Sequence, residues 1–141
     1  MQITGLDGKT YAWNFSKYNK QGENCSIIHS RARILLHNLF PYDIIHEEVS
    51  LPGIRNEVVN KALQLDFYIN SQKLAIEVQG EQHYKHTKFF HTNKLEFFRA
   101  RKLDSLKRQW CQINGITLIE LPYNESDEQW TQAIRNRQWI Q

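Results

Sequence analysis

The sequence predicts a mixed α/β fold, in which a central mixed β-sheet is flanked by helices and preceded by an N-terminal β-hairpin. Three patterns support this prediction. Residues 63–79 alternate apolar and polar side chains with the period of two that paired strands show. Residues 93–114 repeat apolar side chains at helical spacing. The apolar run 116–121 follows that helix and is typical of a buried strand.

Length and composition indicate one globular domain. The chain has 141 residues, of which 40% are hydrophobic and 23% charged, and its net charge is +3. This mild basic bias permits a nucleic-acid partner. Cys25 and Cys111 form no metal-binding pattern and are expected to be reduced thiols. No apolar run approaches the roughly 18 residues that a membrane span needs, so we expect a cytoplasmic protein with no membrane contact.

Residues 1–24 are predicted to form the N-terminal hairpin and a polar joint, and residues 25–141 the core. Asp7-Gly8 is a strong turn signal within residues 2–15. Three aromatic side chains alternate after the turn, and packing is favoured over base stacking for them. They are Tyr11, Trp13 and Phe15.

A first helix is predicted over residues 26–39, with Ser26 as its N-cap and Pro41 beyond its end. Arg31 and Arg33 on this helix are either phosphate contacts or part of a solvated face, and the solvated face is favoured. Residues 43–49 then form a predicted strand that carries two acids, Glu47 and Glu48.

Residues 63–79 are predicted to form two strands joined by a turn at Asn70-Ser71. The alternation gives the first strand one buried face and turns Asp66 and Tyr68 away from it. On the second strand, Glu77 and Gln79 share one face. Single acids in strands are most often solvated, but three converging oxygen-bearing side chains suit Mg²⁺.

The helix over 93–114 is expected to end at Gly115. Its apolar stripe should face the sheet, with four polar residues away from it. The stripe is Leu95, Phe98, Leu106, Trp110 and Ile113, and the polar residues are Arg101, Asp104, Lys107 and Arg108. Residues 85–108 hold eight Lys or Arg against two acids. This charge indicates either a solvated face with an Asp104–Arg108 pair or a phosphate-contacting stripe.

A terminal helix is predicted over residues 126–139, with Ser126 as N-cap. Trp130, Ile134 and Trp139 should dock it. The sequence leaves open whether Arg135 and Arg137 contact DNA.

The spacing from Asp66 to Glu77-Val78-Gln79 resembles the PD-(D/E)XK nuclease motif in its E-x-Q variant, where Gln replaces the usual Lys. Three blocks in order, IEVQGEQHY, FFRARKLDSLKRQWC and GITLIELPY, resemble small phage and bacterial endonucleases related to the very-short-patch repair (Vsr-like) group. The resemblance covers Leu63 to Tyr123. It implies a restriction-endonuclease-like core and favours the phosphate-contacting stripe.

The resemblance also implies roles for individual residues. Mg²⁺, with Mn²⁺ as substitute, would be held by Asp66, Glu77 and the backbone carbonyl of Val78. Gln79 would position the attacking water, and Lys107 would stabilise charge with Asp104 orienting it. His83 would be a general base or a phosphate contact. Relatives often carry a Glu in the first helix as a further metal ligand, where this chain has His29.

The function implied is a metal-dependent endonuclease that cleaves double-stranded DNA, with a site-specific homing enzyme from a phage or mobile element as the favoured version. DNA contacts are predicted at Lys85, Lys88, Arg99, Arg101, Lys102 and Arg108. A homodimer or higher symmetric oligomer is expected if both strands are cut. Two alternatives stay open: a nuclease-derived DNA-binding module with weakened catalysis, and a branched-DNA resolvase.

Overall fold

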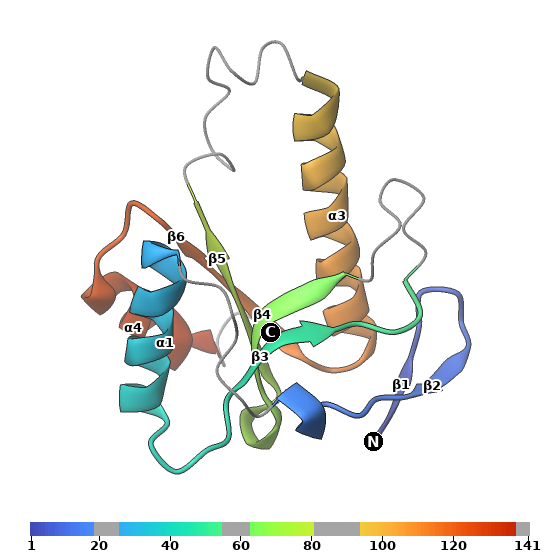
Figure 1. The fold of residues 1–141 in the computed structure, drawn as a ribbon, viewed down its shortest axis with the longest axis horizontal. Helices are drawn as coiled ribbons and strands as arrows, with labels where there is room; N and C mark the ends of the chain where they lie inside the picture. The colour runs from blue at the N-terminus through green and yellow to red at the C-terminus, as the bar shows by residue number, and fades with distance from the viewer. Residues whose placement is uncertain (19–25, 55–62, 81–93, 138–141) are drawn as a thin grey trace.

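The fold is known from a computed structural model, which describes residues 1–18, 26–54, 63–80 and 94–137 (Figure 1). Its strands are β1 (Gln2–Thr4), β2 (Thr10–Ala12), β3 (His46–Ser50), β4 (Gln64–Ile69), β5 (Leu74–Gln79) and β6 (Thr117–Pro122). Its α-helices are α1 (Ile27–Leu39), α3 (Lys94–Ile113) and α4 (Asp127–Arg135). Two short 3₁₀ helices are η1 (Ser16–Tyr18) and η2 (Asn70–Gln72).

The main sheet has four strands in the order β3-β4-β5-β6. The first two neighbouring pairs are antiparallel, whereas β5 and β6 run parallel. Parallel strands need a crossover connection, and α3 supplies it. The predicted mixed α/β fold with an N-terminal hairpin is therefore confirmed.

The sheet is covered on both faces. Figure 1 shows α1 and α4 on one side and α3 with the β1–β2 hairpin on the other. The α1/α4 layer of the core contains Ala32, Leu36, Phe67, Ile69, Leu74, Ile76, Trp130 and Ile134. The α3/hairpin layer contains Ile3, Trp13, Val49, Leu65, Tyr68, Ala75, Trp110 and Cys111.

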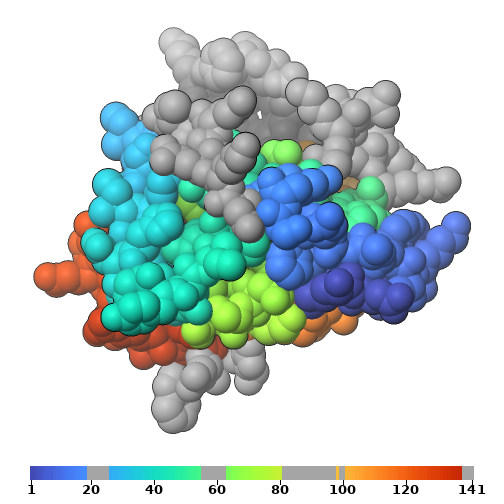
Figure 2. Space-filling view, turned by 60° about the horizontal axis from the view of Figure 1, so that its bottom comes forward, coloured from blue at the N-terminus to red at the C-terminus, as the bar shows by residue number. Residues whose placement is uncertain are grey.

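The N-terminal hairpin forms around the predicted Asp7-Gly8 turn, where Gly8 has the positive φ of +81° that glycine adopts at little cost. Trp13 is buried, with its ring 4.7 Å from that of Tyr68 and 5.0 Å from that of Trp110. Its indole Nε1 also donates to the Ser50 carbonyl over 2.9 Å. Packing is thus the role of this aromatic, as predicted, and Figure 2 shows the blue N-terminal segment lying against the green part of the chain.

The predicted ends of α1 and α3 and the predicted start of α4 agree with the structure to within one residue, but α4 ends at Arg135 rather than at the predicted position 139. The Ser26 side chain accepts from the His29 N–H, and Ser126 forms a capping box with Gln129. Gly115 follows α3 with φ +67°. Trp130 and Ile134 dock α4 as expected, and residue 139 lies outside the described residues. Within the described ranges, no helix is long and apolar enough to cross a membrane.

The predicted apolar stripe of α3 is only partly correct. Trp110 is fully buried, but Phe98 is 57% and Ile113 51% exposed, so neither faces the sheet. The side chain of Leu95 lies outside the described residues. Lys107 and Arg108 were expected to point away from the sheet, yet both pair with glutamates on its strands because those acids lie on the α3 face.

The predicted one-sided burial of β4 is wrong. Tyr68 is fully buried, because the α3/hairpin layer covers the face expected to be polar. Leu65 belongs to this same layer, whereas Phe67 two residues later packs toward α1 and α4. The alternation therefore breaks between them, at Asp66.

The solvated-face interpretation of the α1 arginines is also wrong. Arg33 donates from Nε and Nη2 to the two oxygens of Glu47, both over 2.8 Å. Arg31 binds the Glu125 carbonyl over 2.6 Å and lies 3.7 Å from the Trp130 ring centre. Both guanidinium groups thus hold the fold together.

Candidate functional site

The sheet is interrupted at Asp66. The β4–β5 ladder runs from Ile69 opposite Leu74 to Phe67 opposite Ile76 and stops there. On the other edge of β4, the β3–β4 ladder skips the position where Asp66 faces Glu48. Glu48 has φ +52°, a left-handed conformation that regular strands do not contain. Asp66 therefore lies where regular strand pairing is broken on both sides.

Where the β4–β5 pairing stops, two carboxylates accept hydrogen bonds from backbone N–H groups. Glu77 Oε2 accepts from the Asp66 N–H over 3.3 Å, and Asp66 Oδ2 accepts from the Val78 N–H over 2.9 Å. Each acid thus bonds the main chain of the opposite strand, which draws the two carboxylates together. Because the N–H and C=O of a strand residue project from the same edge, the Val78 carbonyl also lies on the Asp66 side.

A cation from α3 reaches this pair. Lys107 Nζ donates to Glu77 Oε1 over 2.7 Å, and both side chains are largely buried. Burial, and then the charge of Asp66, raise the pKa of Glu77 well above its usual value. Burial works to lower the pKa of Lys107, but the Glu77 carboxylate outweighs it and the net pKa is raised. Lys107 is therefore a charged partner held by the carboxylate pair.

A third acid, Glu120, lies beside the pair on β6. The parallel register places it directly next to Glu77. Its Oε2 accepts from Gln79 Nε2 and, over 2.9 Å, from Arg108 Nη2, while its Oε1 accepts from Arg108 Nε. The sequence prediction missed this residue. The available signal was an acid inside the otherwise apolar run 116–121, as Glu77 is in its own strand.

These side chains line a cavity of about 150 Å³. Its lining residues are Asp66, Glu77, Val78, Gln79, Asp104, Lys107, Leu118 and Glu120. With one negative charge assigned to each of the four lining acids and one positive charge each to Lys107 and Arg108, the group has a formal charge of −2. The predicted convergence of Asp66, Glu77 and Gln79 is thus confirmed, with Lys107 and Asp104 beside them.

The cavity contains oxygen atoms of the kind that bind hard divalent cations. Within the described ranges, no three His, Cys, Asp or Glu side chains are grouped as metal ligands. The donor set is instead two carboxylates, Asp66 and Glu77, and the Val78 carbonyl, all oxygen atoms of the kind Mg²⁺ prefers. After burial, the charge of Asp66 is the next cause that raises the pKa of Glu77, and a bound cation would offset this repulsion between the two acids.

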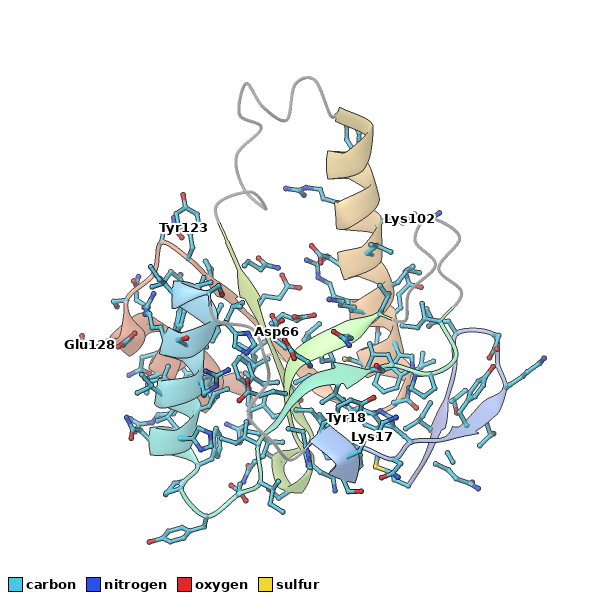
Figure 3. All side chains as sticks on the ribbon, viewed as in Figure 1. Lys17, Tyr18, Asp66, Lys102, Tyr123 and Glu128 are labelled. Atoms are coloured by element: carbon cyan, nitrogen blue, oxygen red, sulfur yellow. The ribbon has the colours of Figure 1, made fainter. Side chains whose placement is uncertain are left out.

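Only some of the predicted DNA-binding residues are described by the structure. Of that set, Lys85, Lys88 and the side chain of Arg99 lie outside the described residues, as does His83, which was predicted to act in catalysis. Arg101 and Lys102 are exposed on α3. Lys102 lies about 140° around the helix from Lys107, and Figure 3 shows it on the side of α3 away from Asp66. Arg108, a predicted phosphate contact, donates to both carboxylate oxygens of Glu120.

His29, Arg33 and Glu47 form a polar cluster outside the cavity. His29 is fully buried, stacks on Phe67 with ring centres 4.4 Å apart, and its Nε2 lies 2.9 Å from Glu47 Oε1. Arg33 binds the same carboxylate. Glu47 is therefore bound to side chains on the α1 side of the sheet.

Three viral proteins are similar to part of this chain. Uncharacterized protein 094L of Frog virus 3 (isolate Goorha) is 43% identical over 82 residues, which are 57% of this chain and 53% of that protein. Uncharacterized protein 307L of Invertebrate iridescent virus 6 is 44% identical over 68 residues, 48% and 34% of the two chains. Uncharacterized protein 033L of Invertebrate iridescent virus 3 is 39% identical over 70 residues, 50% and 36%.

The matched segments thus span from about a third to about half the length of these relatives. No family model matches the chain, and no solved structure matches it.

Proposed function

We propose that the protein is a Mg²⁺-dependent endonuclease that hydrolyses phosphodiester bonds of double-stranded DNA. The observation that carries this proposal is the cavity in which Asp66, Glu77 and Gln79 converge at the break in the β4–β5 ladder. Metal-dependent phosphodiester hydrolysis calls for paired carboxylates and a cationic side chain at one solvent-reachable point, and Lys107 supplies the latter.

Each residue at the cavity has a separate role in the proposed hydrolysis. When bound, Mg²⁺ would supply an activated water and neutralise a phosphate oxygen. Asp66, Glu77 and the Val78 carbonyl would hold the cation, and Gln79 would orient the attacking water without acting as a base. The water oxygen bonds to phosphorus and one ester P–O bond breaks. The water proton passes to solvent, and the departing oxygen is protonated to a hydroxyl. Lys107 stabilises charge on the phosphate.

DNA would approach along the cavity side of α3. Arg101 is three residues before Asp104 and seven before Arg108, so these three side chains share one face of the helix. We place the first phosphate contact there. Site-specific cleavage of the homing type, a symmetric dimer and a cytoplasmic location belong to the same proposal.

Plasmid cleavage with purified protein and Mg²⁺ tests the proposal. Asp66→Ala and Glu77→Ala should each abolish nicking and linearisation, while DNA binding measured without divalent metal stays largely intact. Glu128→Ala is the matched control, because this exposed acid lies on α4 far from the cavity (Figure 3). Cleavage by either cavity variant at the wild-type rate would refute the site. Binding without cleavage by the wild-type protein would instead favour the weakened DNA-binding module, in which Lys107 and Arg108 serve as internal neutralising partners.

A further inference from the structure

We infer that Glu120, held by Arg108, is a positioning residue that fixes the orientation of the Gln79 side-chain amide. In that orientation the NH₂ group donates to Glu120, and the amide oxygen would be the end that meets a water in the cavity that both side chains line. This inference rests on the proposed nuclease function and names how Gln79 serves it.

The orientation follows from hydrogen-bond chemistry. A side-chain amide carries one donor end and one acceptor end, whereas an ionised carboxylate only accepts. The contact between Gln79 and Glu120 can therefore be made only by the NH₂ group. The amide oxygen lies at the opposite end of the group, turned away from Glu120.

Arg108 holds the Glu120 carboxylate in place. Its guanidinium donates to both oxygens of that carboxylate, a two-point contact that fixes the plane of the group. The Glu120 side chain is 25% exposed, so water still reaches it beside the guanidinium. The order of contacts is thus Arg108 to Glu120 to Gln79, running from α3 across β6 to β5.

The orientation matters because water must be held by its hydrogens. An amide oxygen accepts a hydrogen bond from water and leaves the water lone pairs directed elsewhere, toward the phosphorus. An amide turned the other way would donate to the lone pairs needed for attack. Glu120 thus selects between a productive and an unproductive state of one side chain.

Amide NMR tests the orientation in metal-free protein, independently of activity. The side-chain NH₂ resonances of Gln79 are identified by their loss in Gln79→Ala. In wild-type protein one of the two protons should be shifted downfield and protected from solvent exchange, as expected for a bond to a carboxylate. The signature should disappear in Glu120→Ala and persist in Glu128→Gln. Its persistence in Glu120→Ala would overturn the inference.

A side-chain swap tests the consequence for cleavage. Gln79→Glu alone places two carboxylates in repulsion, and Glu120→Gln alone lets the amide pair flip. In the double variant Gln79→Glu/Glu120→Gln, the amide now on β6 donates its NH₂ to the carboxylate now on β5 and accepts from Arg108. An oxygen then again faces the cavity, and the charge of the cavity is unchanged. Each single variant should cleave about tenfold to a hundredfold more slowly at saturating DNA, with DNA affinity retained. The double variant should recover most of the rate.

The outcomes separate this inference from the proposed function. Suppose that Asp66→Ala is inactive but the single variants Gln79→Glu and Glu120→Gln both cleave like wild type. Glu120 then has no positioning role, and the proposed nuclease function still stands. If the double variant is no faster than the singles, orientation is not what Glu120 supplies. If the wild type does not cleave at all, the proposed function is overturned, while the NMR signature still decides whether Glu120 orients the Gln79 amide. Circular dichroism of each variant shows whether it is folded. Arg108→Met is a second variant that should loosen the contact between Glu120 and Gln79, because it removes the guanidinium that holds Glu120.

Discussion

Replacing Arg33 by Met should destabilise the fold more than any other single loss of an arginine in the described chain. The Glu47 carboxylate is 2% exposed, and Arg33, itself 13% exposed, donates to both of its oxygens. Met keeps much of the side-chain volume but removes the guanidinium. Glu47 is then left as a buried anion without its main cationic partner.

The magnitude follows from burial. Removing one partner of a buried ion pair costs about 3–5 kcal/mol, because the remaining charge is stranded in a poorly solvating environment. A domain of this size is stable by about 5–15 kcal/mol in total. The melting temperature should therefore fall by about 10–20 °C.

Thermal and urea unfolding followed by circular dichroism measure this loss. Arg135→Met, the same change at an exposed site on α4, is the control and should melt like wild type. The double variant Arg33→Met/Glu47→Gln removes the stranded charge and should regain part of the lost stability. A double variant no more stable than Arg33→Met, or a loss below about 1 kcal/mol in the single variant, would refute this reasoning.

Three further predictions concern the cavity and its surroundings. Gln79→Lys should retain some plasmid cleavage because Lys can still donate a hydrogen bond to Glu120, whereas Gln79→Ala should lose more of the cleavage rate. A Gln79→Ala variant that cleaved like wild type would exclude a role for this residue in cleavage. Arg101→Ala should reduce the slope of log affinity for DNA against log salt concentration by about one unit. Lys102→Ala, on the other side of α3, should reduce the slope less. If the two variants had the same slope, the DNA would have to bind elsewhere. Burial, with the charge of Glu77, raises the pKa of Cys111 to about 12, so its reactive thiolate is scarce at neutral pH. In a Cys25→Ser background, Cys111 should react with a thiol reagent about a hundredfold more slowly in folded protein than in urea; equal rates would contradict its burial.

Local signals in the sequence predicted the elements well. The Asp7-Gly8 turn, the Ser26 cap and the glycine after α3 each act within a few residues, so they do not depend on what the rest of the chain does. The shared face of Glu77 and Gln79 likewise follows from strand geometry alone. These features are the ones that the structure confirms.

Features that depend on distant partners could not be predicted in this way. Tyr68 is buried because the N-terminal hairpin and α3 cover a face that the alternation alone marks as polar. Phe98 continues the apolar stripe of α3 but remains exposed, so helical periodicity does not say how far the sheet extends beneath a helix. The break in β4 depends on the left-handed Glu48 of another strand. The role of Glu120 depends on a parallel register that only the assembled sheet defines.

The described side chains of the cavity all come from one unbroken piece of the chain, between positions 66 and 120. The hairpin, α1, β3 and α4 support that piece from outside without supplying any of those side chains. One stretch of the chain thus supplies every described side chain of the cavity, whereas the hairpin, α1 and α4 act on it only by covering the sheet, and β3 acts through Glu48 beside Asp66. Substitutions between positions 66 and 120 therefore reach the cavity directly, whereas those in the hairpin, α1 or α4 reach it only through the packing of the sheet.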